Sequence, residues 1–248
     1  MRVDLSADIG ESPPDAPGEG ALLRRVTSVN IACGVHAGDP SVLRWILRQT
    51  REAGVRAGAH PSLPDREGLG RRRLGIGAGA IEDAVIYQIA ALAGLARAED
   101  MPLTHVKPHG ALYHMAWEDE RIAAAVVTAT GLVDGRLAVV GPPGSALLEA
   151  ARRAGLETRA EAFADRAYEA SGRLVPRGMV GAVLTDPGEV AARSVRLVVE
   201  QRVRAVDGTD LNVTAGTLCL HGDTPGAAEL ARAVREALEQ AGVLVVAP

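Results

Sequence analysis

The chain has 248 residues, of which 47% are hydrophobic and 2% aromatic, so we expect a core built mainly from Ala, Val, Leu and Ile. The formal net charge of −4, with no basic run interleaved with aromatic residues, argues against a nucleic-acid partner. The longest apolar stretches, near Ala84–Ala96 and Ala123–Val133, are too short for a membrane span. Cys33 and Cys219 form no CxxC pattern and no signal peptide is evident, so we expect a cytoplasmic protein with no membrane partner.

Short β-like runs alternate with helical patterns along the chain. The predicted strands are Val3–Ile9, Val29–Cys33, Val55–His60, Thr104–Lys107, Leu137–Val140, Arg159–Phe163 and Thr217–His221. Asp39-Pro40 predicts a helix N-cap and a first-turn proline, and Thr224-Pro225 predicts the same before a later amphipathic run. This βα repeat predicts a parallel sheet. Because no Pro/Ser-rich linker divides the chain, we expect one domain over residues 1–248.

Three segments lack a clear strand or helix pattern. Gly10–Gly20, rich in Pro and Gly, predicts a loop in which Ser12 is a turn residue. Asp165–Thr185 and Val206–Thr214 are also irregular, and we expect them to form an excursion or a lid.

Polar residues alternate with apolar ones in several predicted strands. Asp4, Ser6 and Asp8 share one face of the first strand, and His105 and Lys107 share one face of the fourth. The same alternation adds Arg56 and His60 in the third strand and Arg159, Glu161 and Asp165 around the sixth. A parallel strand buried on both faces is normally apolar throughout. The alternation therefore predicts a barrel with a polar lumen or an open sheet with a deep polar cleft.

Most polar clusters fall where predicted strands end, which is where α/β folds bind ligands. The clusters are Asp8–Ser12, Asn30–Pro40, His60–Ser62, Lys107–Gly110, Glu161–Arg166 and His221–Asp223. Because burying an unpaired ion costs several kcal/mol, we expect these groups to be paired, metal-bound or catalytic. Their position on one rim predicts an active site.

Lys107 is the only lysine, against 26 arginines. Arginine is a rigid and permanently charged fork, whereas lysine is a compact point charge whose pKa falls on burial. Lys107 lies between His105 and His109 and has not been replaced by arginine. This indicates that the position needs either the small size of the ammonium group or its ability to release a proton.

Two interpretations of the histidines stay open. Residue types that suit zinc or a similar ion occur at Asp8, His36, His60, His109 and His221. No HxxxH or HExxH spacing places two of them on one helix. The alternative makes these groups general acids and bases, with Lys107 and either Arg71 or Arg72 binding an anionic substrate.

Nucleotide-binding motifs are absent from the sequence. A Walker A motif needs Gly-Lys-Ser/Thr, but the only lysine is followed by Pro108. Gly75–Ala80 loosely matches GxGxxA, yet it follows Arg71–Arg73 rather than a hydrophobic strand, so no dinucleotide site is predicted there.

Several of these motifs resemble the LamB/YcsF family, in order and over nearly the whole chain. The matching segments are Asp4–Ser12, Val26–Pro40, Gly58–Ser62, Gly70–Arg72, Tyr87-Gln88, His105–Tyr113, Glu161–Tyr168 and Cys219–Pro225. Ser6, Val35 and His114 depart from the residues usual in the family, which bears on fine substrate contacts. The resemblance implies a distorted seven-stranded β/α barrel, a TIM-like fold in a superfamily that includes polysaccharide deacetylases.

The resemblance also implies an activity. It is the opening of the lactam of 5-oxo-L-proline (pyroglutamate) to L-glutamate, coupled to ATP hydrolysis, by a 5-oxoprolinase of which this chain is one component. ATP is then a co-substrate bound with two partner subunits, B and C, while a divalent metal stays open. The candidate catalytic residues are Asp8, His36, His60, Lys107 and His109. The candidate substrate-binding residues are Glu11, Asn30, Arg71, Arg72, Tyr113, Glu161, Asp165, Arg166 and His221.

Within this hypothesis Asp8 and either His60 or His109 activate water and transfer protons. Lys107 neutralises phosphoryl or oxyanion charge, and Arg71, Arg72 or Arg166 binds the substrate carboxylate. Two other classes of function stay open: a metal-dependent deacetylase of an N-acetylated sugar, and a non-catalytic binding subunit.

Overall fold

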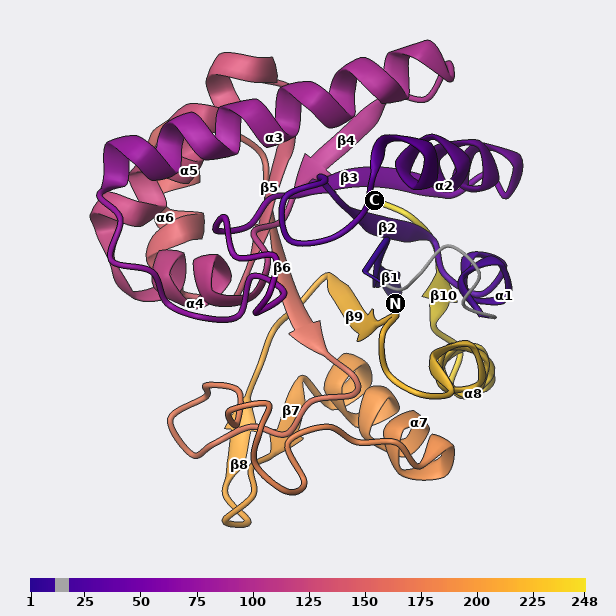
Figure 1. Cartoon of the computed structure of the whole chain (residues 1–248). Helices are drawn as coiled ribbons and strands as arrows, with labels where there is room; N and C mark the ends of the chain where they lie inside the picture. The colour runs from indigo at the N-terminus through magenta and orange to yellow at the C-terminus, as the bar shows by residue number, and fades with distance from the viewer. Residues whose placement is uncertain (12–17) are drawn as a thin grey trace.

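Parallel strands close into a barrel at the centre of the molecule (Figure 1). The structure is a computed structural model that describes residues 1–11 and 18–248. The barrel strands are, in order, β1 (Arg2–Ile9), β2 (Ser28–Ala32), β3 (Arg56–His60), β4 (Leu103–Val106), β5 (Ala138–Gly141), β6 (Thr158–Phe163) and β9 (Thr217–His221). β1 pairs with β2 on one side and with β9 on the other, which closes the barrel. The predicted strands are confirmed to within one residue at each end. Of the two arrangements that the sequence left open, the barrel is confirmed and the open sheet is not.

Helices surround this barrel (Figure 1). They are α1 (Glu19–Leu23), α2 (Pro40–Glu52), α3 (Ala78–Ala98), α4 (Gly110–Glu118), α5 (Glu120–Asp134), α6 (Ala146–Arg153), α7 (Pro187–Val195) and α8 (Ala227–Gln240), with a π-helical turn η1 (Arg196–Glu200) after α7. A short strand β10 (Leu244–Val245) pairs with the start of β1. The apolar face of each strand packs against these helices, as Leu5, Ala7 and Ile9 of β1 do, and this layer forms the main hydrophobic core.

The two predicted helix starts have different outcomes. The Asp39 carboxylate accepts hydrogen bonds from the backbone N–H groups of Ser41 and Val42, so the predicted N-cap of α2 is confirmed. The prediction at Thr224 is wrong, because α8 begins at Ala227. The Thr224 hydroxyl instead donates to the buried Asp165 carboxylate. The Thr224 side chain therefore makes a tertiary hydrogen bond and not the local helix cap that the sequence pattern predicted.

Helix α3 has the length and composition of a membrane span, with 21 residues and a mean hydropathy of 1.3. The expectation that the stretch near Ala84–Ala96 is too short therefore does not hold for the whole helix, which continues beyond it at both ends. One such helix is weak evidence, since core helices of globular proteins share these properties. Ile81, Val85, Ile89 and Leu92 of α3 lie in the hydrophobic core, which is the packing of a barrel helix.

An excursion follows β6, as the irregular sequence there predicts. Residues 164–186 form turns and isolated bridges, including Arg166 with Val183. The prediction is wrong in part for Val206–Thr214, because β8 (Asp210–Asn212) lies within it and forms an antiparallel hairpin with β7 (Arg202–Arg204). Figure 1 shows the excursion, the hairpin and α7 on one side of the barrel. The predicted loop at Gly10–Gly20 ends where α1 begins at Glu19, and Ser12 lies outside the described residues.

The barrel interior is polar, as the alternation in the strands predicts. Lys107, directly after β4, contacts Asp8 of β1, and because these strands are not neighbours the contact crosses the lumen. His105 Nε2 lies 2.8 Å from Asn30 Oδ1 of β2, a contact that passes over the intervening strand β3. Gly58 of β3 makes space for this ring, since a Cβ atom there would collide with the His105 imidazole.

Candidate active site

Lys107 lies at the centre of the polar interior and is 1% exposed. Its Nζ is 2.8 Å from Asp8 Oδ1, 2.8 Å from Glu161 Oε2 and 3.1 Å from Cys219 Sγ. Burial alone would lower the pKa of Lys107, but the carboxylates of Asp8 and Glu161 outweigh burial and hold this pKa well above its usual value. The side chain is therefore an ammonium ion at neutral pH, and it is compact enough for this enclosed space.

The two carboxylates that share this ammonium differ. Burial opposes ionisation of Asp8, yet Lys107 and His60 hold the pKa of Asp8 well below its usual value. The pKa of Glu161 is raised, first by burial and then by the nearby charge of Asp8, in spite of Lys107. The Tyr113 hydroxyl donates to Glu161 Oε1 over 3.0 Å. Asp8 is therefore the stronger candidate for an ionised base.

Two histidines face each other beside Asp8. His60 ends β3 and His109 immediately precedes α4, with 3.0 Å between His60 Nε2 and His109 Nδ1. Their other ring nitrogens lie against backbone carbonyls: His60 Nδ1 is 2.7 Å from Lys107 O, and His109 Nε2 is 2.8 Å from Leu69 O. Because a carbonyl only accepts, these two nitrogens carry protons. His60 Nε2 also lies 3.5 Å from Asp8 Oδ2.

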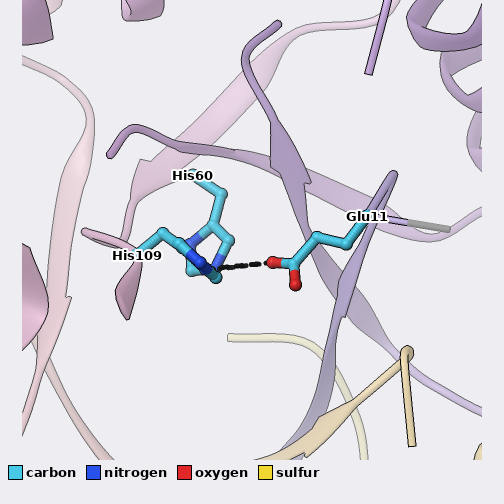
Figure 2. Close-up of side chains that lie close together, drawn as sticks. All are labelled: Glu11, His60 and His109. Carbon is cyan, nitrogen blue, oxygen red and sulfur yellow. Dashed lines mark hydrogen bonds and ion pairs between the residues drawn. The ribbon is translucent and has the colours of Figure 1, made fainter. Parts of the chain in front are cut away.

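Glu11 approaches the same point from the end of β1 (Figure 2). Glu11 Oε1 lies 3.0 Å from His109 Nδ1 and 3.7 Å from His60 Nε2. Burial alone would raise the pKa of Glu11, but His109 and His36 outweigh it and hold this pKa well below its usual value. Burial would lower the pKa of His109, whereas Glu11 raises it, with a net increase. The pair is therefore a strongly coupled acid and base.

His36 supports this group from behind. Its ring stacks on His109 with 4.0 Å between centroids, and its Nδ1 lies 2.8 Å from Ser62 Oγ. Burial lowers the pKa of His36 to about 4, so the ring is neutral at neutral pH. The Ser62 backbone N–H in turn donates to the side chain of Gln88 in α3, which anchors the loop that carries Ser62.

Two glycines let the loop before α3 approach the histidines closely. Gly70 has a φ of +67°, and a Cβ atom there would lie 2.9 Å from His109 Cδ2. Gly110 has a φ of +54°, and a Cβ atom there would lie 2.5 Å from Gly70 O. Glycine reaches positive φ without the steric cost that other residues carry. This close packing brings Leu69 O to His109, so the two glycines help to orient the His109 imidazole.

His221 and Asp165 form a third group at the end of β9. The Asp165 carboxylate accepts from the His221 backbone N–H over 3.0 Å and lies 3.0 Å from His221 Nδ1. The His221 ring stacks on Phe163, and its Nε2 points toward Asp8 Oδ2 at 3.9 Å. Asp165 is fully buried, so it positions His221 and does not reach the cavity itself.

A cavity of about 380 Å³ opens above these groups. Its floor includes Asp8, His60, Lys107 and His109, and its walls include Tyr113, Phe163 and His221. Its rim carries five arginines: Arg71, Arg73, Arg166, Arg173 and Arg177. This arrangement is suited to a small anionic ligand held above a base and two imidazoles.

The rim arginines are held by nearby groups. Asp223 pairs with Arg71 at 2.5 Å and with Arg177 at 2.7 Å, and Glu118 pairs with Arg73 and Arg173. Arg166 is buried and donates to the backbone carbonyls of Val175 and Ala182. Within the described part of the chain, Arg166 forms no ion pair with a carboxylate.

The structure brings most predicted site residues together. The five candidate catalytic residues lie in one connected group, with Glu11, Tyr113, Glu161, Asp165, Arg166 and His221 around it. Arg72 is an exception: its side chain is 59% exposed, and its guanidinium pairs with Asp65 instead of lining the cavity. Asn30 lies beneath the floor, where its Nδ2 donates to Asp8 Oδ1, so it holds a catalytic candidate and does not line the cavity.

Sequence reasoning missed part of the site. Arg173 and Arg177 come from the irregular excursion, where no periodicity distinguishes them from the other arginines. Arg73 and His114 also line the cavity, and the parity of β9 places Cys219 beside Lys107. Of these, only Cys219 had a usable signal, because Cys219 and His221 share one face of a predicted strand.

Known proteins resemble this chain over its full length. The sequence profile of the LamB/YcsF family matches residues 3–248. A protein of Streptomyces coelicolor, named as the A subunit of 5-oxoprolinase, is 51% identical over 97% of both chains. A protein of the same name from Chloroflexus aggregans is 48% identical, covering 100% of this chain and 99% of its own. The crystal structure of a lactam utilization protein from Thermus thermophilus has a TM-score of 0.92 and 47% identity, with both chains covered completely.

Proposed function

The chain belongs to the LamB/YcsF family, and on that premise we propose that it is a subunit of an ATP-hydrolysing 5-oxoprolinase. This hydrolase acts on a cyclic amide, opening the lactam of 5-oxo-L-proline to give L-glutamate. The observation that carries the proposal is the convergence of Asp8, His60 and His109 on the floor of an arginine-rimmed cavity. The identity of the substrate is inferred from the names of the relatives, which are called 5-oxoprolinase components. The chemistry of the cavity alone would suit many small anionic amides.

The rim arginines bind the substrate in this proposal. The cavity volume of about 380 Å³ lies near the lower end of the range for small-molecule sites, about 300–1,000 Å³. Arg166 is the favoured partner of the substrate carboxylate, because it lines the cavity and forms no direct ion pair with a carboxylate of the described residues. Arg177 and Arg71, which share Asp223, are suited to phosphoryl oxygens.

The chemical step begins with activation of a stable amide. Phosphorylation of the lactam carbonyl oxygen by ATP makes its carbon electrophilic. Water then attacks this carbon while Asp8, or His60 Nε2 beside it, takes the proton. His109 donates a proton to the ring nitrogen as the C–N bond breaks, which leaves an acyl phosphate. A second water converts the acyl phosphate to the carboxylate and inorganic phosphate.

Lys107 acts through its neighbours. Its contacts with Asp8, Glu161 and Cys219 are already made, so we assign it to holding Asp8 ionised and in place. The ammonium also adds positive potential beneath the carbonyl where negative charge develops. Glu161, held by Tyr113, completes the charge balance of the floor.

ATP is proposed to bind with the partner subunits. The sequence has no Gly-Lys-Ser/Thr segment, and the relatives are named as the A subunit of their enzyme, which implies further subunits in their complexes. We therefore propose two partners, B and C, that bind ATP and help to deliver or form the phosphorylated lactam. The arginine rim would then face the partner from which the phosphoryl group comes.

Glutamate release from 5-oxoproline tests this function. The protein alone is expected to release none, and the protein mixed with its partner subunits and ATP is expected to release glutamate and inorganic phosphate together. Glutamate release that does not depend on this chain would contradict the proposal. So would phosphate release that is never accompanied by glutamate.

A metal-dependent deacetylase is the second candidate, favoured by the convergence of Glu11, His60 and His109. It predicts release of acetate from N-acetylated sugars by the chain alone, without ATP. A non-catalytic binding subunit, the remaining alternative, predicts that changes at Asp8 leave the turnover of the complex unchanged.

A further inference from the structure

Three side chains offer ligand atoms to one point on the cavity floor (Figure 2). Glu11 Oε1, His60 Nε2 and His109 Nδ1 all lie within 4.8 Å of one another. The separations are 3.0 Å between the two histidine nitrogens, 3.0 Å from Glu11 to His109 and 3.7 Å from Glu11 to His60. The three residues come from the ends of β1 and β3 and from the turn before α4.

The backbone orients both imidazoles toward this point. His60 Nδ1 and His109 Nε2 are protonated because each lies against a carbonyl, of Lys107 and of Leu69 respectively. In the neutral rings, the lone pairs of His60 Nε2 and His109 Nδ1 then face each other and the Glu11 carboxylate. Three electron-rich atoms this close repel one another unless a proton or a metal cation lies between them. Metal-ligating histidines typically donate their other N–H to a carbonyl or carboxylate in this way.

Two buried atoms in the group lack a hydrogen bond. Glu11 Oε1 and His36 Nε2 are buried and lie 3.4 Å apart, and neither makes a hydrogen bond of normal geometry with the described residues. An unsatisfied buried polar atom costs about 1–3 kcal/mol, and more when it is charged. The Glu11 side chain is 4% exposed, so water does not readily satisfy its oxygen. A cation bound to Glu11 Oε1 removes that cost.

The spacing of the three atoms fits a transition-metal ion. Ligands about 2.0–2.1 Å from a tetrahedral zinc ion lie about 3.3 Å from each other. The observed separations of 3.0, 3.0 and 3.7 Å lie on both sides of this value. Two imidazoles with one carboxylate favour zinc or cobalt over magnesium or calcium, which prefer oxygen ligands.

We propose that Glu11, His60 and His109 bind one divalent transition-metal ion of the zinc class, with its open coordination position toward the cavity. Asp8 Oδ2, 3.5 Å from His60 Nε2, lies at the edge of this site. Such an ion polarises a carbonyl or lowers the pKa of a bound water. The site itself rests on ligand geometry alone, but a bound ion occupies His60 Nε2 and His109 Nδ1, so in the metal-bound state the proton transfer assigned above to His60 and His109 falls to Asp8 and to water on the ion.

A proton on His109 Nδ1, shared with Glu11 Oε1, is the competing occupant of the same space. It predicts no metal uptake beyond the nonspecific level. The two occupants are therefore separated by metal binding itself, without substrate, ATP or partner subunits, so failure of the proposed reaction leaves this result interpretable.

Equilibrium dialysis of the chelator-treated, full-length chain against ZnCl₂ measures the site directly. The expected result is one Zn²⁺ per chain, with a higher thermal unfolding midpoint on binding. Replacement by Co²⁺ is expected to give the visible d–d absorption of a low-coordinate, nitrogen-ligated ion. Mg²⁺ at the same concentration is expected neither to bind nor to displace Zn²⁺.

Matched variants locate the ion. Glu11→Gln and His109→Gln are each expected to lower Zn²⁺ affinity by more than the roughly 10- to 100-fold that follows loss of an outer-shell partner. His114→Gln changes a cavity histidine outside the group and is expected to keep wild-type affinity. Circular dichroism verifies folding of each variant. Absence of saturable Zn²⁺ uptake by the wild type, or uptake unchanged by both ligand substitutions, would overturn the proposal.

Discussion

Lys107 shows at the residue scale why a single lysine persists in a chain with 26 arginines. Its ammonium nitrogen lies within 3.1 Å of side-chain atoms of Asp8, Glu161 and Cys219, and the residue is only 1% exposed to solvent. A planar guanidinium is larger and presents its donors in a fixed fork, so it does not reproduce three contacts in different directions. The sequence pattern indicated either small size or proton release. The environment supports small size, because the neighbouring charges keep the lysine protonated.

Replacing Lys107 by Met is expected to lower the free energy of unfolding by about 3–5 kcal/mol, because two buried carboxylates lose their counter-ion. Urea unfolding at neutral pH measures this change. Adding Glu161→Gln to the same variant removes one of the stranded charges, so the double variant is expected to recover part of the loss. A change below about 1 kcal/mol in the single variant would contradict this account.

His105 makes the free energy of unfolding depend on pH, and the direction of this dependence follows from its pKa. Burial lowers the pKa of folded His105 to about 3, whereas an unfolded histidine titrates near pH 6.5. Between these values the unfolded chain binds a proton that the folded chain does not, so stability falls as the pH decreases through this window. One such group contributes a slope of at most about 1.4 kcal/mol per pH unit.

His105→Gln is therefore expected to make the unfolding free energy less dependent on pH between about pH 6 and pH 4.5. Urea unfolding of both proteins across this range measures the slope. The contributions of His36 and His114, whose pKa values are also lowered by burial, cancel in the comparison. Parallel curves for the two proteins would show that His105 does not titrate in this way.

At the scale of elements, local sequence signals predicted the strands well and the helix starts less well. The seven barrel strands were predictable because each strand either has one apolar and one polar face or is followed by residues typical of a turn. Asp39 caps α2 as its pattern indicates, while Thr224 gives its hydroxyl to Asp165. The hairpin of β7 and β8 was missed because each strand has only three residues, with one apolar residue between two polar ones, which is too short a run to reveal an alternation.

A substitution at Gly110 tests how the backbone turn before α4 positions the His109 imidazole. Gly110→Ala is expected to destabilise the fold by about 1–2 kcal/mol or more, because its φ of +54° disfavours a side chain and Gly70 O occupies the space of the new Cβ. Thermal or urea unfolding measures the loss. Limited proteolysis in the loop that contains Arg71 reports whether the loop is displaced from His109.

Gly131→Ala in α5 is the matched control, because open space surrounds Gly131 and its backbone is helical. That change is expected to raise the free energy of unfolding by about 0.5–1 kcal/mol. Equal effects of the two substitutions would contradict a special role for Gly110.

At the scale of the whole molecule, closure of the barrel assembles the floor of the site. It brings together Asp8, Lys107 and Cys219, which are separated by about one hundred residues at each step along the chain. This part was predictable, because parallel strands place their carboxyl ends on one rim. Of the arginine rim, Arg71 and Arg166 were predicted, whereas Arg173 and Arg177 were not. These two lie in an excursion without periodicity, and their positions follow from ion pairs with Glu118 and Asp223.

Glutamate formation by the assembled complex, carrying either wild-type or Asp8→Asn chain, tests the central claim most directly. Asparagine keeps the shape of Asp8 but cannot take a proton from water. The expected result is a loss of turnover of at least about 100-fold with the complex still assembled, while Asp39→Asn, which preserves a helix cap outside the cavity, keeps wild-type turnover. Wild-type glutamate formation by the Asp8→Asn complex would contradict the claim that this cavity opens the lactam.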